Sequence, residues 1–421
     1  MKRISKGMKS AVAVTAVAAV AITSTIAAQT STPANAASSQ TKNVILFVGD
    51  GMGTAQRDAI RLATVGENGK LAMDAMPFVG LIHTSSTTPV TDSAASATAY
   101  ASGVKTYNGA IGMDANKKSV KTIMEYAKAA GKSTGVVTTS QVTDATGAAF
   151  GAHVEDRSQQ SDIALQYLSK SKIDVILGGG EDFWYPAGDP GKFKDEPAED
   201  PSEKSKGTQG NLVNKAKAMG YNFVSNGTEL SKAKGGKLLG LFANEEMFQQ
   251  RPEGQGDIYN PVVSLPDMTK KAIDTLAANK KGFFLMVEEE GTDEFAHSNN
   301  AKMTIKAGQQ LDRSVQIAKD FAKKNPDTLV LVLADHETGG FSIEEVDAKD
   351  ESTDGVTISS EDGPFAIANS KLNFVVDWTT SGHTAVDVPV TATGKNAELF
   401  SGVFENTEIF TKLMQSLGFK K

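Results

Sequence analysis

Ser93 is the residue of this chain whose position best suits nucleophilic chemistry. It lies in the run Val90-Thr-Asp-Ser-Ala-Ala-Ser-Ala-Thr-Ala99, where a loop is expected to turn into a helix. The free amide groups and the dipole of a first helical turn favour an anion, so a serine there could attack as an alkoxide or hold a phosphate. Helix capping is the alternative role for such a serine. Because no histidine is close to Ser93 in the sequence, we expect a cation to activate it.

Two apolar runs lead into carboxylates. Asp50 stands within Gly-Asp-Gly-Met-Gly after the run 43–48, where a simple turn is the alternative. The run 283–287 is followed by three glutamates and then by Asp293 and His297, which would share one face of a helix because they are four residues apart. An exposed acidic helix start would explain the same residues. Three glutamates directly after a buried strand are costly without a compensating ion, which favours a metal site.

A third apolar run, 328–334, ends beside Asp335 and His336. His383, in a Ser-Gly-His-Thr loop, could complete a site from elsewhere in the chain, although loop histidines are often only exposed. The chain has five histidines, and three of them, His297, His336 and His383, lie in acidic or glycine-flanked positions. Mixed carboxylate and imidazole ligands are typical of zinc.

Alternating strand and helix patterns are expected to position these residues. We predict strands at 43–48, 133–139, 173–177, 283–287 and 328–334, and helices at 119–130, 267–279 and 301–323. Near-continuous apolar strands indicate an α/β fold with a large, mainly parallel central sheet flanked by helices on both faces. Ligands of such sheets lie beyond the carboxyl ends of the strands.

The first 36 residues are typical of an export signal. Four basic residues precede the uncharged, apolar run 11–28, and Ala34-Asn-Ala36 suits cleavage. A retained membrane anchor is the less favoured alternative, because the run is diluted with Ala and Thr. Loss of this segment changes the formal net charge from −7 to −11, which implies no nucleic-acid-binding patch. We therefore expect an exported protein, secreted, periplasmic or associated with the cell envelope.

Residues 37–421 are expected to form a single catalytic domain with no retained membrane span. Two stretches, 186–210 and 347–363, are rich in polar, Pro or Gly residues and are predicted to be surface insertions. The chain contains no cysteine, so disulfides and thiolate metal sites are excluded. Its stability must come from a large core, with metals as a further contribution.

Taken in order, the motifs resemble the alkaline phosphatase family. The resemblance spans nearly all of the mature chain and is densest from Asn43 to Met113. It rests on Asp50 within its glycines, on Thr91–Ala99 continuing to Gly103–Gly109, on Asp144-Ala-Thr146 with Ala152–Arg157, on Ala334-Asp-His336 and on His383-Thr384.

The resemblance implies a role for each matching residue. Ser93 matches the serine that is transiently phosphorylated, Arg157 the arginine that clamps the phosphoryl oxygens, and Asp92 the acid that orients it. The family's two zinc ions and one magnesium ion imply three ligand sets: Asp293, His297 and His383 for one zinc, Asp50, Asp335 and His336 for the other, and Asp50, Thr146 and Glu288 for magnesium, with Asp144 in its outer shell. A homodimer is also implied.

This resemblance predicts hydrolysis of phosphate monoesters through a phosphoserine, for phosphate scavenging. One departure is Glu294, beside Asp293, where better-known members of the family carry Lys, His or Trp. Glu289 and Glu290 are acidic where small residues are common. A carboxylate near a dianionic phosphate should repel it or hold an additional cation, although Glu294 could instead point to solvent.

Two alternatives remain from the sequence. A phosphodiesterase, sulfatase or cofactor-independent phosphomutase of the same superfamily would share the metal ligands, but Ser93 with Arg157 favours a monoesterase. An exported phosphate- or metal-binding protein without turnover would keep the ligands and would not need Ser93.

Overall fold

The computed structural model describes residues 40–193, 204–249, 259–346 and 361–420. The export signal predicted for 1–36 lies outside these ranges. So do the middle of the first predicted insertion, 186–210, and most of the second, 347–363. Asp362 and Gly363, which we assigned to the second insertion, belong to a strand, because Asp362 pairs with Val376 of a neighbouring strand. The buried Asp362 side chain also accepts hydrogen bonds from the backbone of Ala301 (2.7 Å) and from Trp378 Nε1 (3.1 Å).

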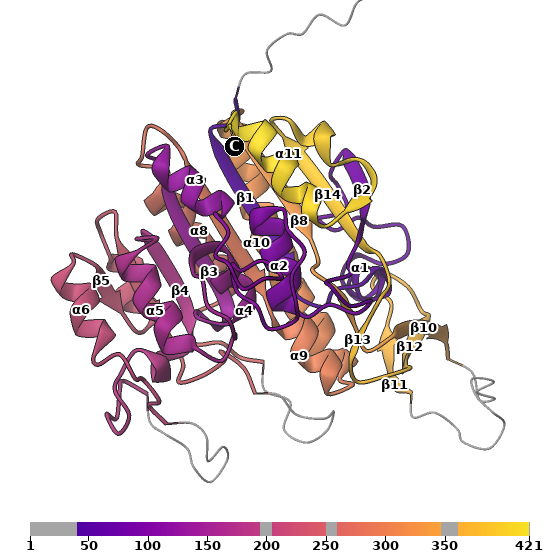
Figure 1. Cartoon of the computed structure of the whole chain (residues 1–421). Helices are drawn as coiled ribbons and strands as arrows, with labels where there is room; N and C mark the ends of the chain where they lie inside the picture. Colours follow the sequence, from indigo (N-terminus) through magenta and orange to yellow (C-terminus); the bar gives the residue numbers. More distant parts are fainter. Residues whose placement is uncertain (1–39, 194–203, 250–258, 347–360, 421) are drawn as a thin grey trace, which may run out of the picture. The chain divides into compact units, whose positions relative to one another are not determined.

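The predicted strands form the centre of a larger sheet (Figure 1). Ten of the described strands pair in the order β15-β2-β14-β8-β1-β7-β3-β4-β6-β5. Their bounds are β1 Asn43–Gly49, β2 Phe78–His83, β3 Ser133–Gln141, β4 Val175–Gly179, β5 Asn222–Val224, β6 Leu238–Leu241, β7 Phe283–Glu289, β8 Thr328–Leu333, β14 Val388–Gly394 and β15 Gly402–Glu405. Within this sheet β14 alone runs antiparallel to its neighbours, so the mainly parallel sheet is confirmed.

The middle strands show why the apolar runs form strands. Every residue of β1, β7 and β8 is buried, as expected where helices cover both faces. β1 pairs in parallel with β7 on one side and with β8 on the other. The three strands therefore end at one edge of the sheet, and the polar residues that follow them meet there.

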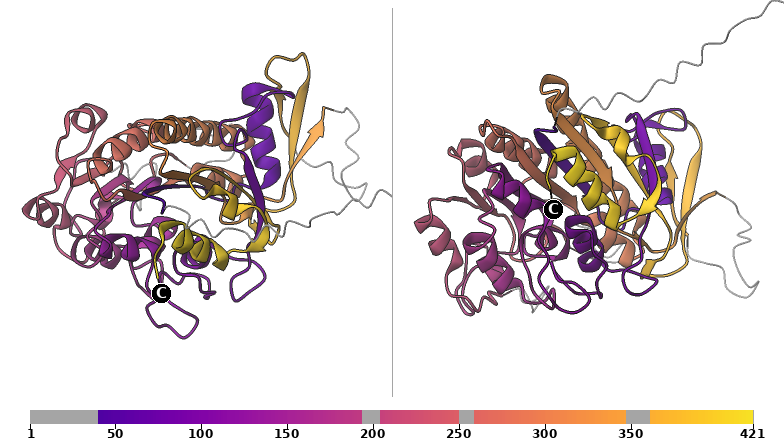
Figure 2. Two further views of the ribbon diagram at one scale, coloured as in Figure 1. Left: turned by 90° about the horizontal axis from the view of Figure 1, so that it is seen from above. Right: turned by 45° about the horizontal axis from the view of Figure 1, so that its top comes forward.

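Helices form a layer on each face of the sheet (Figure 2). α8 and α10 pack together on one face, while α2, α3, α4 and α11 pack on the other, so the predicted arrangement is confirmed. The helices are α1 Thr54–Val65, α2 Ser93–Ser102, α3 Ile123–Ala129, α4 Ala145–Gly151, α5 Gln160–Ser169, α6 Leu212–Ala218, α7 Gly227–Lys232, α8 Leu265–Leu276, α9 Gly291–His297, α10 Ala301–Lys324 and α11 Thr407–Leu417. In the described ranges, no helix combines the length and apolarity that a bilayer crossing requires.

Helix ends differ from the prediction where capping residues decide them. The helix predicted at 119–130 begins only at Ile123, because Thr122 and Glu125 form a reciprocal capping box. The helix predicted at 267–279 begins at Leu265, because Ser264 accepts a hydrogen bond from the backbone of Asp267.

Two small sheets complete the described fold. β10 Phe341–Glu345, β12 Asn373–Trp378 and β11 Asp362–Ala366 form an antiparallel sheet in that order. β9 Glu337–Thr338 pairs with β13 His383–Thr384. This short pairing holds the His383 loop against the segment that follows β8.

Candidate active site

The eight expected metal ligands gather at the carboxyl edge of the sheet. Asp50 follows β1, Glu288 is the penultimate residue of β7, and Asp335 and His336 follow β8. α9 begins directly after β7 and carries Asp293 and His297, α4 carries Thr146 after β3, and β13 carries His383. Residues far apart in the sequence thus meet because their strands run in parallel.

Asp293, His297 and His383 lie close together, and Asp293 and His383 are also close enough to His336 to share one ion with it. His297 Nδ1 lies 2.7 Å from the Ser381 carbonyl and His383 Nδ1 lies 2.9 Å from the Thr91 carbonyl, so each Nδ1 donates a proton. In the neutral rings each Nε2 is then an acceptor, and the two Nε2 atoms are only 3.1 Å apart. Asp293 oxygens lie 3.2 Å from His297 Nε2 and 3.8 Å from His383 Nε2. Two Nε2 acceptors and a carboxylate that face one another suit a cation with tetrahedral coordination, such as zinc.

The pKa values of this group reflect the same geometry. The hydrogen bond between His297 and Asp293 raises the pKa of His297 to about 9. Although burial opposes it, the hydrogen bond from His297 and the neighbouring imidazoles lower the pKa of Asp293. A proton therefore binds firmly between these side chains, and a metal ion would compete with it.

Asp50, Asp335 and His336 form a second group. His336 Nε2 lies 3.3 Å from an oxygen of Asp335 and 3.5 Å from an oxygen of Asp50. All three residues are buried, and Asp50 Oδ1 and Asp335 Oδ2 have no hydrogen-bond partner within the described part of the chain. Burial raises the pKa of Asp335 to about 7 and lowers that of His336. A cation is the partner that these atoms lack.

Thr146 and Glu288 extend the second group with oxygen atoms only. Thr146 Oγ1 donates to the second oxygen of Asp50 at 3.1 Å. Glu288 Oε1 is buried and has no partner in the described residues, and burial raises the pKa of this carboxyl to about 7. An all-oxygen set of this kind suits magnesium. Asp50, Asp335 and His336 thus form a group that could hold a metal ion, as expected, and Asp293 and His383 form a second such group with His336.

Ser93 is the first residue of α2 and is almost fully buried. Asp92 caps the helix by accepting a hydrogen bond from the backbone of Ala95 at 2.9 Å. Ser93 Oγ lies 3.2 Å from His336 Nε2, although the sequence placed no histidine near it. Because that nitrogen also faces Asp50 and Asp335, it suits a metal ligand better than a lone general base.

Two further side chains of α2 hold the helix against the residues that follow β8. Ser96 Oγ donates to the carbonyl of Asp335 at 2.9 Å, and the Tyr100 hydroxyl donates to the carbonyl of Ala334 at 2.7 Å. Ser93, Ser96 and Tyr100 share one face of the helix. Together they fix the position of Ser93 relative to His336.

Arg157 is anchored beside Ser93 by two carboxylates. Its backbone N–H donates to Gly109 O at 2.8 Å, and one terminal nitrogen contacts both oxygens of Asp144, at 2.9 and 3.2 Å. The other terminal nitrogen lies 3.5 Å from Asp92. The charge of Asp144 raises the pKa of Arg157 further. Asp144, expected in the outer shell of magnesium, is thus the main partner of the arginine.

The three consecutive glutamates have different environments. Glu289 accepts hydrogen bonds from the hydroxyl of Tyr259 (2.5 Å), from Thr139 Oγ1 (2.8 Å) and from the backbone of Gly291 (3.1 Å), and it fixes the start of α9. Glu290 is only 4% exposed, and its Oε2 lacks a partner in the described residues.

Glu294 is half-buried beside the site. Burial and the negative charges of Asp293 and Glu246 raise its pKa to about 8. Asp144 and Glu294 likewise contribute to raising the pKa of Glu290, after burial itself. Burial and the surrounding carboxylates therefore favour the protonated, uncharged forms of Glu290 and Glu294 near neutral pH.

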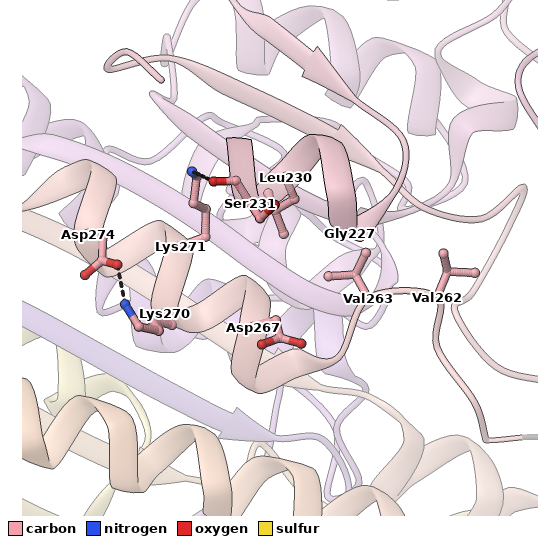
Figure 3. Close-up of a pocket in the computed structure, with 9 residues that line it drawn as sticks. All are labelled: Gly227, Leu230, Ser231, Val262, Val263, Asp267, Lys270, Lys271 and Asp274. Carbon is pink, nitrogen blue, oxygen red and sulfur yellow. Dashed lines mark hydrogen bonds and ion pairs between the residues drawn. The ribbon is translucent and has the colours of Figure 1, made fainter. Parts of the chain in front are cut away.

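A pocket between α7 and α8 lies apart from these residues (Figure 3). It is lined by Gly227, Leu230, Ser231, Val262, Val263, Asp267, Lys270, Lys271 and Asp274. Lys270 Nζ contacts Asp274 at 2.6 Å, and Lys271 Nζ donates to the Ala233 carbonyl at 2.6 Å. The pocket includes none of the site residues predicted from the sequence.

Some residues of the site were missed by sequence reasoning. Ser96 and Tyr100 could have been found, because they lie three and seven residues after Ser93 on one helical face. Thr338, whose hydroxyl donates to Asp293, and Glu246, whose charge raises the pKa of Glu294, could not have been found. These interactions join segments that are distant in the sequence.

Known proteins resemble this chain along most of its length. A family model described as alkaline phosphatase matches residues 41–419. Alkaline phosphatase 4 of Bacillus subtilis is 34% identical, covering 87% of each chain. Alkaline phosphatase of Escherichia coli is 33% identical over 90% of this chain and 86% of its own. Streptomycin-6-phosphate phosphatase of Streptomyces griseus is 32% identical over 90% of this chain and 91% of its own.

Solved structures of alkaline phosphatases also resemble this chain. Alkaline phosphatase from the Antarctic bacterium TAB5 has a TM-score of 0.73 at 32% identity, covering 91% of this chain and all of its own. The Thermus thermophilus enzyme has a TM-score of 0.74 at 25% identity, covering 91% and 92%. The alkaline-phosphatase-like fold expected from the sequence is confirmed. This chain belongs to the alkaline phosphatase family and is a phosphoric monoester hydrolase.

Proposed function

We propose that the chain hydrolyses phosphate monoesters through a phosphorylated Ser93. The observation that carries this proposal is the position of Ser93 Oγ, in the first turn of α2 and 3.2 Å from His336 Nε2 within the Asp50 group. Two zinc ions and one magnesium ion, held by the three ligand sets described above, would stabilise the serine alkoxide and the negative charge that develops on the leaving oxygen.

The chemistry of the chain's own residues proceeds in two displacements. Ser93 Oγ loses its proton and attacks phosphorus, the bond from phosphorus to the ester oxygen breaks, and the alcohol leaves with a proton. Water then attacks the phosphorus of phosphoserine, which releases inorganic phosphate and returns the proton to Ser93. Arg157 binds two equatorial oxygens of the phosphoryl group, with Asp92 and Asp144 holding its guanidinium in place.

The cellular location and the oligomeric state are part of the same proposal. We infer that the protein is exported and supplies inorganic phosphate by scavenging it from phosphate esters. We also infer a homodimer. Val79, Leu81 and Val403 are 57%, 38% and 61% exposed at the β2–β15 edge of the sheet, and an apolar surface of this kind suits contact with a second copy.

An acid-quench experiment tests the proposed intermediate. The zinc- and magnesium-loaded protein is mixed with a ³²P-labelled monoester, quenched in acid and digested for mass spectrometry. We expect the label on Ser93. Label on another residue, or none during turnover, would contradict the assignment.

Rates on a matched monoester, diester and sulfate ester test the substrate class. We expect the monoester to be the best substrate, because Arg157 can bind the two free oxygens that it offers. Faster turnover of the diester would assign the chain to diesters. A panel of natural monoesters then distinguishes general scavenging from a narrow specificity, such as the name of the Streptomyces griseus relative indicates for that protein.

A further inference from the structure

Thr338 connects the two groups that contain histidine. It lies two residues after His336, in β9, and is fully buried. Its Oγ1 donates a hydrogen bond to Asp293 Oδ1, and the same oxygen lies 3.3 Å from His336 Nδ1. We propose that Thr338 is a positioning residue that sets the tautomer of His336 and couples the two zinc sites. This inference rests on the proposed function, because the zinc sites do.

The hydrogen bonds of Thr338 leave one arrangement of protons. A hydroxyl has a single proton, and an ionised carboxylate only accepts, so the proton of Thr338 goes to Asp293. The oxygen that faces His336 Nδ1 is then an acceptor, and Nδ1 must carry the ring proton. His336 Nε2 is therefore left with a lone pair, which faces Ser93, Asp50 and Asp335.

The backbone around Thr338 holds its hydroxyl in place. Thr338 N–H donates to Gly51 O at 3.1 Å, and its carbonyl accepts from Gln56 Nε2 at 3.0 Å. Gly51 has a φ of +62°, and a Cβ there would lie 2.6 Å from Thr338 Oγ1 and 2.4 Å from Asp293 Oδ1. The loop after β1 thus packs directly on this hydrogen bond.

Thr338 couples the two zinc sites because its two hydrogen-bond partners, Asp293 and His336, belong to different ligand groups. Asp293 belongs with His297 and His383, and His336 belongs with Asp50 and Asp335. Loss of the hydroxyl would free Asp293 to rotate and would allow His336 to carry its proton on Nε2, where it cannot bind a metal. One side chain therefore affects both zinc ions.

Substitutions at Thr338 test this role. Thr338→Val keeps the shape and removes the hydroxyl, while Thr338→Ser keeps the hydroxyl. Thr269→Val is the matched control, because Thr269 is a fully buried threonine of α8 whose hydroxyl has no partner in the described residues. Zinc dissociation constants are measured by competition with a chromogenic chelator, and kcat and KM are measured with p-nitrophenyl phosphate at saturating zinc.

We expect Thr338→Val to weaken the binding of both zinc ions by about 10- to 100-fold, the usual effect of losing a residue that orients a metal ligand. Its kcat should fall even at saturating zinc, with KM changed less. Thr338→Ser and Thr269→Val should resemble the parent.

Parent-like zinc binding by Thr338→Val would overturn the proposal, and so would weakening of only one zinc ion or a serine variant as impaired as the valine variant. If Thr338→Val does not fold, Thr338→Ala takes its place with the same criteria. Because zinc binding is measured without substrate, a parent protein that binds zinc and lacks phosphatase activity would refute the proposed function and leave this test intact.

Discussion

The polar side chains at the sheet edge around Ser93 and those in the pocket between α7 and α8 differ in whether they have partners. In the pocket, Lys270 is paired with Asp274, and Lys271 donates to the carbonyl of Ser231 (Figure 3). Lys271 also donates to the carbonyl of Ala233, just after α7. At the sheet edge, buried oxygens of Asp50 and Asp335 have no partner in the described residues. Charged groups with partners need no ligand, whereas buried groups without partners imply one. Buried polar atoms without partners therefore indicate the active site better than a pocket does.

The largest effect should come from Ser93→Ala. We expect turnover of a phosphomonoester to fall by at least about a thousandfold, because the attacking atom is removed. Circular dichroism should remain unchanged. Ser231→Ala, in the pocket, removes a hydroxyl that only donates to the carbonyl of Thr228 and should leave turnover at the parent value. Near-parent turnover by the Ser93 variant would show that Ser93 matters to catalysis no more than the pocket residue Ser231 does.

Metal removal should have the next largest effect. Exhaustive chelation should abolish activity, and zinc with magnesium should restore it. The melting temperature should fall as well, because bound ions at a thousand times their dissociation constant stabilise a fold by about 4 kcal/mol per site. Lys270→Met, which breaks the exposed pair with Asp274, should change neither property much. Full activity of metal-free protein, verified by elemental analysis, would show that the unpartnered carboxylates do not bind a catalytic ion.

Glu294→Lys should give a smaller change. At a pH above 8, where the half-buried Glu294 beside Asp293 is ionised, its replacement by a cation should tighten inhibition by phosphate, by about tenfold if the interaction changes by 1.4 kcal/mol. Where product release limits the rate, maximal turnover should fall too. Asp274→Lys makes the same change of charge in the pocket and should leave the inhibition constant unaltered. Equal constants for the parent and the Glu294 variant, at equal metal content, would mean that Glu294 does not act on the phosphate site.

His153→Gln should affect stability more than turnover. His153 contacts the carbonyl of Gly112 through Nδ1 (2.8 Å) and Glu125 through Nε2 (3.1 Å). Burial opposes protonation, yet these two acceptors raise the pKa of His153 above 6.5. Its contribution to stability is therefore complete below pH 6.5 and is lost as the pH rises through the raised value.

Urea denaturation at several pH values measures this contribution. The parent should exceed the His153 variant by about 1 kcal/mol near pH 6 and by less at high pH. His83→Gln, at an exposed pair with Asp387, is the control and should change little. A stability difference that does not vary with pH would show that His153 acts by packing alone.

The parts of the fold that the sequence predicts are those with a local signal. The apolar runs of β1, β7 and β8 are buried on both faces and could be recognised directly. Strand β2, which lies between β14 and the edge strand β15, could not, because the exposed Val79 and Leu81 interrupt the expected alternation of polar and apolar residues. The antiparallel direction of β14 also has no local signal, since it depends on how the preceding chain returns to the sheet.

The same limit applies to the site. Asp50, Asp335 and His336 were predicted because polar residues at the end of a buried strand stand out. Asp293, His297 and His383 were also found from the residue pattern, whereas the roles of Arg157, Thr146 and Asp144 came from the resemblance to a family. The contacts of Arg157 with Asp144 and of Thr338 with Asp293 join segments 13 and 45 residues apart, and only the packed structure brings them together.

The pairing of β9 with β13 has a consequence for biosynthesis. This pairing and the hydrogen bond of His383 Nδ1 to the Thr91 carbonyl hold His383 at the site, and His383 is encoded more than 280 residues after Ser93. A ribosome has made the proposed nucleophile, the arginine and most of the proposed ligands before the last histidine emerges, so the nascent chain still lacks the complete proposed ligand set. Catalytic competence therefore appears late in translation, and fragments released early remain inactive wherever they accumulate.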